Sequence, residues 1–445
     1  MGKRVVVLGA GVTGEAFVSA LRRLDAEAEI TVVEHELLGG ECSYWACIPS
    51  KTLLRPLEVI ARARLAPGAA EAVTAVDAAK VFGWRDEVSE KDDTSQERWL
   101  VDLGAEIVRG TGVVAEPGLV KVGERELPYD ALLVATGSRA AEPPIEGLDE
   151  VAHWGSREAT SASAVPESLA VVGGGAVGCE LAQLYARFGA RVTLVQNGPR
   201  LLPRVDADAA ELLEARFREE GIDLRLGAKA NRVEGGGGGE PYRLALEGEE
   251  PVEAERLLVA TGRRPNVEGF GFERLDLTVE RPGIVVDETL AAGEAVWAAG
   301  DVTGVALFTH VGKYQARIAA ANVAGGNARA DYTAVPAAVF TDPQVASTGD
   351  TSGENAVTAT WKLSSVSRTA TFQRPKQPGF LKLYADPKQG VLVGGTAVGP
   401  EAGEWIGQVT LAIRAAVPVE VLRDTIQPFP TFSEAVFFAA RDLAL

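Results

Sequence analysis

Two stretches of the chain follow the same order of apolar and polar positions. The apolar run from Val5 to Leu8 indicates a buried strand, and residues 169–172 repeat the pattern. Each run leads at once into a turn with glycines in the spacing GxGxxG, and then into a helical stretch that ends near Leu24 in the first copy and near Phe188 in the second. The sequence therefore predicts two copies of one strand-turn-helix unit.

The glycine turns indicate nucleotide binding. Glycine lets the backbone approach a pyrophosphate, which then lies on the N-terminus of the helix. A second strand in the first unit ends on Glu34, whose carboxylate would accept hydrogen bonds from the ribose hydroxyls of an adenine dinucleotide. The alternative is a tight turn in an ordinary α/β protein. The glycines expected at the two nucleotides are Gly9, Gly11, Gly14, Gly173, Gly175 and Gly178.

The rest of the chain fits a protein of several domains. Residues 52–110 are mainly helical and polar, and short strands are expected around residues 113–122. From residue 331 onward, strands with alternating polar and apolar positions mix with helices. The length of 445 residues predicts about three domains of ~150 residues each.

The charge balance limits the partners. The net charge is -18, from 62 acidic against 44 basic residues, and such a surface repels nucleic acid and anionic membranes. No apolar run approaches the ~20 residues of a membrane span, and the run before the first glycine turn is too short for a signal peptide. We expect a cytoplasmic protein with neither nucleic acid nor a membrane as partner.

Two of the three cysteines, Cys42 and Cys47, lie five positions apart. In a straight helix with a rise of ~1.5 Å per residue their Cα atoms would be about 8.7 Å apart, whereas a disulfide needs roughly 4.4 to 6.8 Å. A bond between them therefore requires a bent backbone, which Gly39 and Gly40 permit. Pro49 suits the first turn of a helix and would place Cys47 at its N-terminus, where the dipole favours a thiolate. The alternative is a pair of buried small apolar residues.

The cysteine segment resembles a known motif. Residues 39–51 read Gly-Gly-Glu-Cys-Ser-Tyr-Trp-Ala-Cys-Ile-Pro-Ser-Lys. They resemble the motif GGTCxNxGCxPSK of the class I FAD-dependent pyridine nucleotide disulfide oxidoreductases, which include dihydrolipoamide dehydrogenase, glutathione reductase and mercuric reductase. The chain keeps both glycines, both cysteines and Pro-Ser-Lys, but carries Ser-Tyr-Trp-Ala between the cysteines. The resemblance covers essentially the whole chain.

The resemblance implies the architecture of the family, an α/β protein with two Rossmann-like nucleotide-binding domains and a C-terminal α+β dimerisation domain. The implied division is an FAD-binding domain formed by residues 1–145 and 266–330, an NAD(P)-binding domain at 146–265, and an interface domain at 331–445 that forms a homodimer. The implied cofactors are FAD and NADPH or NADH.

The resemblance also implies the roles of the site residues. Cys42 and Cys47 would form a redox-active disulfide, with Cys47 nearest the flavin and Cys42 facing the substrate. Lys51 would pair with Glu180 beside the flavin, although Glu180 could instead be a helix-start acid stabilised by the dipole. Asp301, after a buried strand, would reach the FAD. The other residues expected at the cofactors are Gly40, Lys51, Thr136, Gly137, Gln196, Arg200 and Gly262.

Gln196 bears on the choice of nicotinamide cofactor. The second strand of the second unit ends on Gln196, where an NAD-preferring protein usually has Asp or Glu. A neutral amide does not repel a 2′-phosphate, and Arg200 and Arg204 could pair with one. We therefore expect NADPH rather than NADH, unless these arginines are solvated ion-pair partners.

The C-terminal segment lacks an expected base. Family members that exchange thiols carry His-Pro-Thr-x-x-Glu, whereas this chain reads Phe-Pro-Thr-Phe-Ser-Glu from Phe429 to Glu434. The acid is retained and the imidazole that would move the thiol proton is absent. Mercuric reductase also lacks this histidine but has a C-terminal cysteine pair, which this chain does not have. Phe429, together with Tyr44 and Trp45, would line the entrance to the site on the side of Cys42 with aromatic rings, which suits a planar acceptor. The alternative is that these rings only fill the space of the lost imidazole.

These residues predict an NAD(P)H oxidoreductase that passes two electrons through FAD and the cysteine pair to a small acceptor, either quinone-like or an unusual thiol or disulfide. One alternative is a dihydrolipoamide dehydrogenase-type enzyme or another reductase of low-molecular-weight disulfides. A second is a nucleotide-binding homologue with weakened catalysis.

Overall fold

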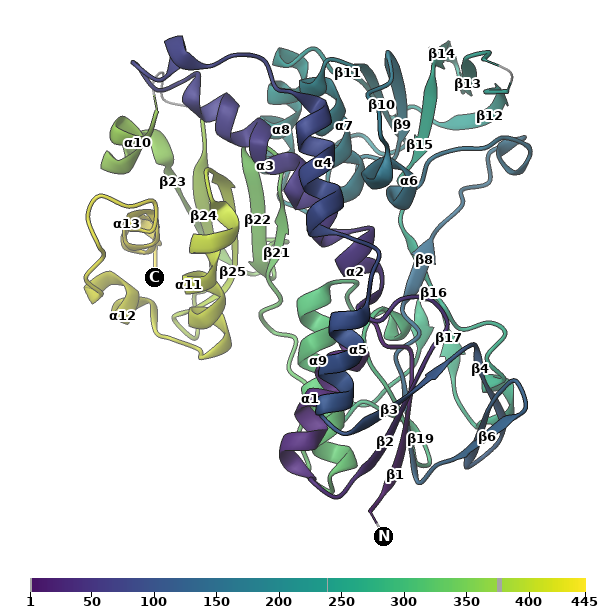
Figure 1. Ribbon diagram of the computed structural model, residues 1–445. Helices are drawn as coiled ribbons and strands as arrows, with labels where there is room; N and C mark the ends of the chain where they lie inside the picture. Colours follow the sequence, from purple (N-terminus) through teal and green to yellow (C-terminus); the bar gives the residue numbers. More distant parts are fainter. Residues whose placement is uncertain (1, 238, 374–377) are drawn as a thin grey trace. The chain divides into compact units, whose positions relative to one another are not determined.

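The computed structural model describes residues 2–237, 239–373 and 378–445, and the chain divides into two compact units (Figure 1). The first unit contains the residues up to Pro49, together with Asp86–Ala141 and Gly262–Asp331. The second contains Ser50–Arg85, Glu142–Thr261 and Tyr332–Leu445. Two helices run across the unit boundaries in the sequence, α3 (Cys47–Ala63) and α4 (Ala78–Val88).

The first unit is built on a six-stranded sheet in the order β19-β20-β7-β1-β2-β3. All neighbouring strands are parallel except β19 with β20. The apolar runs form its centre, because a parallel strand is covered on both faces and needs apolar side chains on both. The strands are β1 (Arg4–Leu8), β2 (Glu29–Glu34), β3 (Ala105–Arg109), β7 (Ala131–Val134), β19 (Ala291–Gly293) and β20 (Val296–Ala298).

Three helices of the first unit matter for the site. Helix α1 (Val12–Leu24) follows β1 and packs against α9 (Thr309–Val323), and α5 (Thr94–Asp102) packs against β3 (Figure 1). Smaller elements complete the unit: α2 (Gly40–Tyr44), an antiparallel sheet of β4 (Gly112–Glu116), β5 (Leu119–Val122) and β6 (Arg125–Pro128), a pair of β8 (Ser138–Ala140) and β16 (Arg263–Pro265), and a pair of β17 (Val279–Glu280) and β18 (Gly283–Ile284).

The second unit repeats the parallel arrangement in a four-stranded sheet of order β11-β10-β9-β15. Its strands are β9 (Ser168–Val172), β10 (Arg191–Gln196), β11 (Asp223–Leu226) and β15 (Arg256–Val259). The helices of this part are α6 (Ser156–Ser161), α7 (Ala176–Phe188) and α8 (Ala207–Glu219). Between β11 and β15 the chain forms a separate antiparallel sheet of β12 (Ala230–Gly235), β13 (Tyr242–Leu246) and β14 (Glu249–Ala254).

The C-terminal part of the second unit is a five-stranded antiparallel sheet in the order β21-β22-β25-β24-β23. Its strands are β21 (Ala337–Val339), β22 (Gln344–Gly349), β23 (Val357–Lys362), β24 (Phe380–Asp386) and β25 (Val391–Gly399), and its helices are α10 (Ser367–Phe372), α11 (Ala402–Arg414), α12 (Val419–Asp424) and α13 (Glu434–Asp442). The expected α/β fold class with an α+β C-terminal part is confirmed. No helix of the described residues is long and apolar enough to cross a membrane.

The two strand-turn-helix units fold alike because the same atoms meet in both. Gly9 and Gly173 have φ of 96° and 114°, where a side chain would be strained. A Cβ on Gly14 would lie 2.1 Å from the carbonyl oxygen of Gly9, and one on Gly178 would lie 1.8 Å from that of Gly173. The last glycine of each turn therefore lets the helix start directly against the strand.

This contact predicts unequal effects for two glycines in the second turn. Gly178→Ala should lower the free energy of unfolding by about 1–3 kcal/mol, as overpacking of a dense contact usually does. Gly175→Ala is the matched control, because a Cβ there meets no atom within 4 Å and its φ of -79° suits alanine. Thermal melts of the two variants measure the difference, and equal melting temperatures would contradict it.

Candidate functional site

The cysteine segment is bent as its glycines allow. Gly39 has φ of 97° and precedes the short helix α2, which ends at Tyr44, and α3 begins at Cys47 as predicted. The backbone N–H of Gly39 donates to the carbonyl of Ala10 at 2.8 Å. A Cβ on Gly40 would lie only 2.9 Å from Cα of Gly11. The segment that carries both cysteines therefore rests directly on the first glycine turn.

Cys42 and Cys47 are free thiols that act on each other. A hydrogen bond with the sulfur of Cys47, and then burial, raise the pKa of the Cys42 thiol. The sulfur of Cys47 is also 3.4 Å from Oγ1 of Thr309, the first residue of α9. The contact with Cys47 and burial thus keep the proton on Cys42.

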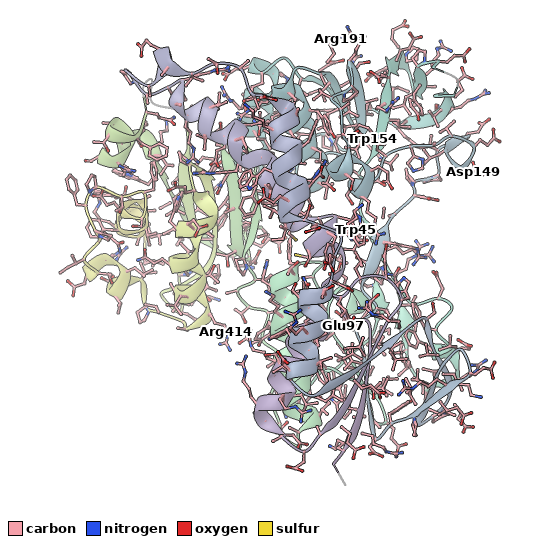
Figure 2. All side chains as sticks on the ribbon, viewed as in Figure 1. Trp45, Glu97, Asp149, Trp154, Arg191 and Arg414 are labelled. Atoms are coloured by element: carbon pink, nitrogen blue, oxygen red, sulfur yellow. The ribbon has the colours of Figure 1, made fainter. Side chains whose placement is uncertain are left out.

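The aromatic residues between the cysteines do not line an open mouth. Tyr44 and Trp45 are 3% and 6% exposed, and their rings pack edge to face at 5.6 Å. Trp45 is labelled in Figure 2. This corrects the expectation of an aromatic mouth formed with Phe429. Both side chains carry a large apolar area, and its burial is strongly favourable.

Glu34 and Gln196 occupy equivalent places in the two repeats. Oε2 of Glu34 accepts from the backbone N–H of Ala10 at 2.8 Å, and Oε1 of Gln196 accepts from that of Gly174 at 2.9 Å. Burial alone would raise the pKa of Glu34, but hydrogen bonds from His35 and from the backbone outweigh it, and the pKa is lowered. Each side chain ties the end of its strand to its glycine turn, and only Glu34 brings a charge.

Asp301 belongs to a network that the sequence did not reveal. Oγ of Ser138 donates to Asp301 Oδ2 at 2.5 Å. Nε of Arg263 donates to Ser138 Oγ at 2.7 Å and lies 3.8 Å from Asp301 Oδ2. Arg263 directly follows Gly262, so the glycine that was expected at a cofactor (φ 132°) also positions this arginine. The network fixes the Asp301 carboxylate near the carboxyl ends of the parallel strands.

Other expected cofactor residues mainly join segments of the protein. Oγ1 of Thr136 donates to the backbone carbonyl of Asn266 at 2.7 Å, and Gly137 follows with φ of 70°. Arg200 donates to the carbonyl of Pro203 at 3.0 Å, and Arg204 is exposed. The structure does not bring the two arginines to Gln196 by any contact among the described residues.

The predicted pair of Lys51 and Glu180 is present in the second unit. Nζ of Lys51 donates to Oε2 of Glu180 at 2.6 Å, and the backbone N–H of Phe340 donates to the other carboxylate oxygen at 2.9 Å. Lys51 also lies 4.8 Å from the centre of the Phe340 ring. Glu180 is 5% exposed. A buried carboxylate held by an ammonium and an N–H is satisfied, which explains how the charge is tolerated.

The C-terminal segment has no imidazole to orient. Phe429 is 73% exposed. Oε2 of Glu434, at the start of α13, accepts from the backbone N–H of Thr431 at 3.1 Å. The retained acid therefore serves as a local cap of the turn before the helix.

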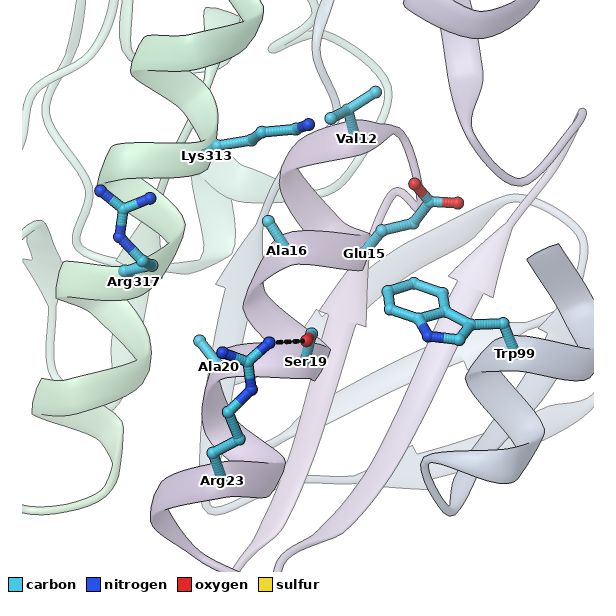
Figure 3. Close-up of a pocket in the computed structure, with 9 residues that line it drawn as sticks. All are labelled: Val12, Glu15, Ala16, Ser19, Ala20, Arg23, Trp99, Lys313 and Arg317. Carbon is cyan, nitrogen blue, oxygen red and sulfur yellow. Dashed lines mark hydrogen bonds between the residues drawn. The ribbon is translucent and has the colours of Figure 1, made fainter.

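A pocket of about 340 Å³ opens beside the start of α1 (Figure 3). Helix α1 supplies Glu15, helix α5 supplies Trp99, and helix α9 supplies Lys313 and Arg317. No sequence motif points to this site, because Glu15 resembles an ordinary first-turn acid and its neighbours come from segments far apart in the chain. Only the charge of Glu15 right after the last glycine could have drawn attention to it.

The family comparisons agree with the motifs. Residues 3–328 match the pyridine nucleotide-disulphide oxidoreductase family, and residues 335–440 match the dimerisation domain of the same family. Dihydrolipoyl dehydrogenase 2 of Haloarcula marismortui is 34% identical, over 99% of this chain and 96% of that protein. A mercuric reductase of Acidithiobacillus ferrooxidans is 35% identical, over 98% of this chain and 82% of that protein.

Solved structures show the same fold. LpdA of Mycobacterium tuberculosis superimposes with a TM-score of 0.88 at 27% identity, covering 99% of both chains. The flavoprotein disulfide reductase RclA of Escherichia coli, in its Cu(II) complex, superimposes with a TM-score of 0.87 at 24% identity, over 98% of this chain and 99% of RclA. The likeness to RclA concerns the fold alone.

The residues present fit the FAD that this family uses. The first glycine turn leaves an N-terminus of α1 without side chains at Gly11, and Glu34 ends the next strand with a buried carboxylate. Asp301 and its network stand at the same end of the sheet. This chain belongs to the class I pyridine nucleotide-disulphide oxidoreductases, enzymes that use FAD and NAD(P)H, and it carries their dimerisation domain.

Proposed function

We propose that the protein takes two electrons from NADPH and passes them through FAD and the Cys42–Cys47 pair to a small acceptor, with a quinone-like compound favoured over a simple disulfide. The observation that carries this preference is Phe429, an exposed ring at the position of the thiol-exchange base. Glu434 caps its own turn and activates no base. The protein would act as a homodimer in the cytoplasm, with the four-segment domain division expected from the sequence.

Bound FAD would supply a two-electron carrier between NADPH and the acceptor. The residues proposed to hold FAD are those of the first glycine turn, Glu34 and Asp301, and the second glycine turn and Gln196 would hold NADPH. Lys51 and Glu180 would keep a fixed, paired charge near the site of hydride arrival. Cys47 would lie nearest the flavin, as the order of the two cysteines in the family motif implies.

Reduction of a low-molecular-weight disulfide is the second candidate. It is favoured by the intact cysteine pair and by relatives named dihydrolipoyl dehydrogenase. A disulfide acceptor requires a proton for each departing thiolate, and removal of a positioned base costs about 10² to 10⁴ in that step. A quinone can be reduced without thiol exchange and is less affected. A homologue with weakened catalysis would reduce neither acceptor.

The cysteine roles predict the spectra of two variants. Two-electron reduction of the FAD-loaded enzyme should produce a long-wavelength band from thiolate-to-flavin charge transfer. Because Cys47 is proposed as the thiolate at the flavin, Cys47→Ser should lose this band and Cys42→Ser should keep it. Absorbance spectra in anaerobic titrations measure the result, and the opposite pattern would exchange the two roles.

Gln196 predicts the cofactor preference. NADPH should reduce the enzyme at least as fast as NADH, because the Gln196 amide holds the glycine turn without a charge to repel a 2′-phosphate. Gln196→Glu keeps the acceptor oxygen and adds the charge, so it should favour NADH. Asn197→Asp is the control, because Asn197 follows Gln196 and is exposed. It adds the same negative charge without changing the side chain that holds the glycine turn. Stopped-flow rates with both cofactors test this, and a strong native preference for NADH would refute it.

Phe429 predicts the acceptor. The native enzyme should turn over quinones much faster than glutathione-type or dihydrolipoamide-type disulfides. Phe429→His, with Glu434 already present, should raise the disulfide rate and lower the quinone-to-disulfide ratio. Ile426→His is the matched control, since Ile426 is 95% exposed in the same segment and should leave the ratio unchanged. Steady-state rates measure both, and native disulfide turnover of about 10 per second or more would favour the second candidate.

A further inference from the structure

The pocket beside α1 contains an acid that the proposed route of electrons does not use. Oε1 of Glu15 is buried and accepts no hydrogen bond from any residue that the structure describes. Figure 3 shows its carboxylate next to the Trp99 ring, with the Lys313 side chain reaching over the first turn of α1. An unsatisfied buried carboxyl is costly in a folded protein and therefore often has a function.

Two residues that line the pocket are linked to the cysteine segment through neighbours on their own elements. Its residue Val12 follows Gly11, which meets Gly40 at the start of α2. Its residue Lys313 is one helical turn beyond Thr309, whose hydroxyl contacts the sulfur of Cys47. The positive charge of Lys313 also acts on the Cys42 thiol and lowers its pKa against the stronger effects that raise it.

The positive charges around Glu15 come from two helices. Lys313 and Arg317 lie on α9 and Arg23 lies on α1, where Arg23 donates to Ser19 at 2.9 Å. The facing residue of α5, Trp99, is uncharged. On the side of α2, burial raises the pKa of the Tyr44 phenol to about 12, so that group stays neutral.

Burial decides the protonation of Glu15. It raises the pKa of this carboxyl to about 7, and the charge of Lys313 opposes the shift only in part. A side chain with such a pKa is half protonated at neutral pH, which suits a group that gives and regains a proton in each cycle.

We propose that Glu15 donates a proton to the reduced acceptor in the pocket that Glu15, Trp99 and Lys313 form, and so replaces the absent C-terminal imidazole. This inference rests on the proposed function, because it requires an acceptor that takes protons with its electrons. Trp99, 41% exposed, offers a flat surface against which a planar acceptor can stack. The donor thus lies in the same chain and the same unit as the cysteines.

The proton balance is complete with either class of acceptor. A quinone takes two electrons and two protons: the hydride of NADPH provides both electrons and one proton, and the O–H of Glu15 breaks as the second quinol O–H forms. With a disulfide, the same carboxyl protonates the thiolate that leaves when Cys42 bonds to the other sulfur. Water then returns the proton to the Glu15 carboxylate, so the net reaction consumes NADPH, one solvent proton and the acceptor.

The test is the pH dependence of turnover in FAD-loaded Glu15→Gln. With a benzoquinone as acceptor, the native kcat should fall about tenfold per pH unit above pH ~7, as Glu15 loses its proton. Glu15→Gln should lower kcat by about 10² or more near neutral pH and remove this dependence. Glu124→Gln, an exposed acid of the same unit, is the matched control and should keep the native profile.

A second variant checks the assignment through its sign. Lys313→Met removes the charge that lowers the pKa of Glu15, so the fall in kcat should move to higher pH. The proposal would be overturned if kcat of Lys313→Met falls at the same pH as that of the native enzyme, or if kcat of Glu15→Gln still falls with pH.

Thermal stability gives a readout that does not depend on turnover. The pKa of Glu15 in the folded protein is raised above its ordinary value of 4.5. The contribution of the protonated carboxyl to the free energy of unfolding is therefore fully present below pH ~4.5 and is lost as the pH rises through about 7. Glu15→Gln, which stays neutral, should therefore melt higher than the native protein at pH 8 and not at pH 4.5. Equal melting temperatures at pH 8 would overturn the proposal.

The proposed acceptor class and the proposed proton donor can be refuted independently of each other. A native enzyme that prefers disulfides refutes the quinone preference, and the pH profile is then measured with a disulfide. Fast quinone turnover with an unchanged profile in Glu15→Gln refutes the donor and leaves the acceptor standing.

Discussion

The first unit depends on a contact between two backbones. Gly39 and Gly40 lie against Ala10 and Gly11, through a hydrogen bond of 2.8 Å and an approach that leaves no space for a Cβ. The turn that we propose as the pyrophosphate site and the segment that carries Cys42 and Cys47 are therefore held together without side chains. Backbone contacts of this kind are short and stiff, so a nucleotide bound at this turn would be positioned by the same feature that positions the cysteines.

The two repeats show how one structural device can bring two electrostatic outcomes. In both, a side-chain oxygen at the end of the second strand accepts the N–H of the residue after the first glycine. Glu34 and Gln196 are interchangeable for this bond and differ only in charge. Selection of a nucleotide can therefore change through one side chain without disturbing the turn, since the geometric requirement and the charge requirement fall on different atoms.

Local patterns predicted what local physics controls. The strands β1 and β9, the helix starts after Gly11 and Gly175, and the helix start at Cys47 follow from apolar runs, glycines and Pro49. The pair of Lys51 and Glu180 needed the family motif, because 129 residues separate its members. The burial of Tyr44 and Trp45 was missed, because the residue types of a motif do not show how the rest of the chain packs around them. The links of Ser138 to Arg263 and of Glu15 to Lys313 were missed for the same reason, because each depends on segments joined only in three dimensions.

The missing imidazole and the buried acid can be understood together. The C-terminal segment that carries the base in other family members belongs to the second unit, whereas Glu15 belongs to the helix that follows the first glycine turn, in the same unit as the cysteines. Burial in the first unit gives this carboxyl a pKa near that of an imidazole, so the two groups can carry a proton over the same pH range. The two groups need different surroundings, because a protonated carboxyl is neutral whereas a protonated imidazole is cationic. Lys313 beside Glu15 stabilises the carboxylate that remains after proton donation, whereas beside an imidazole it would destabilise the cationic form that carries the proton. The cation at this place therefore suits an acid and would oppose the histidine that the chain has lost.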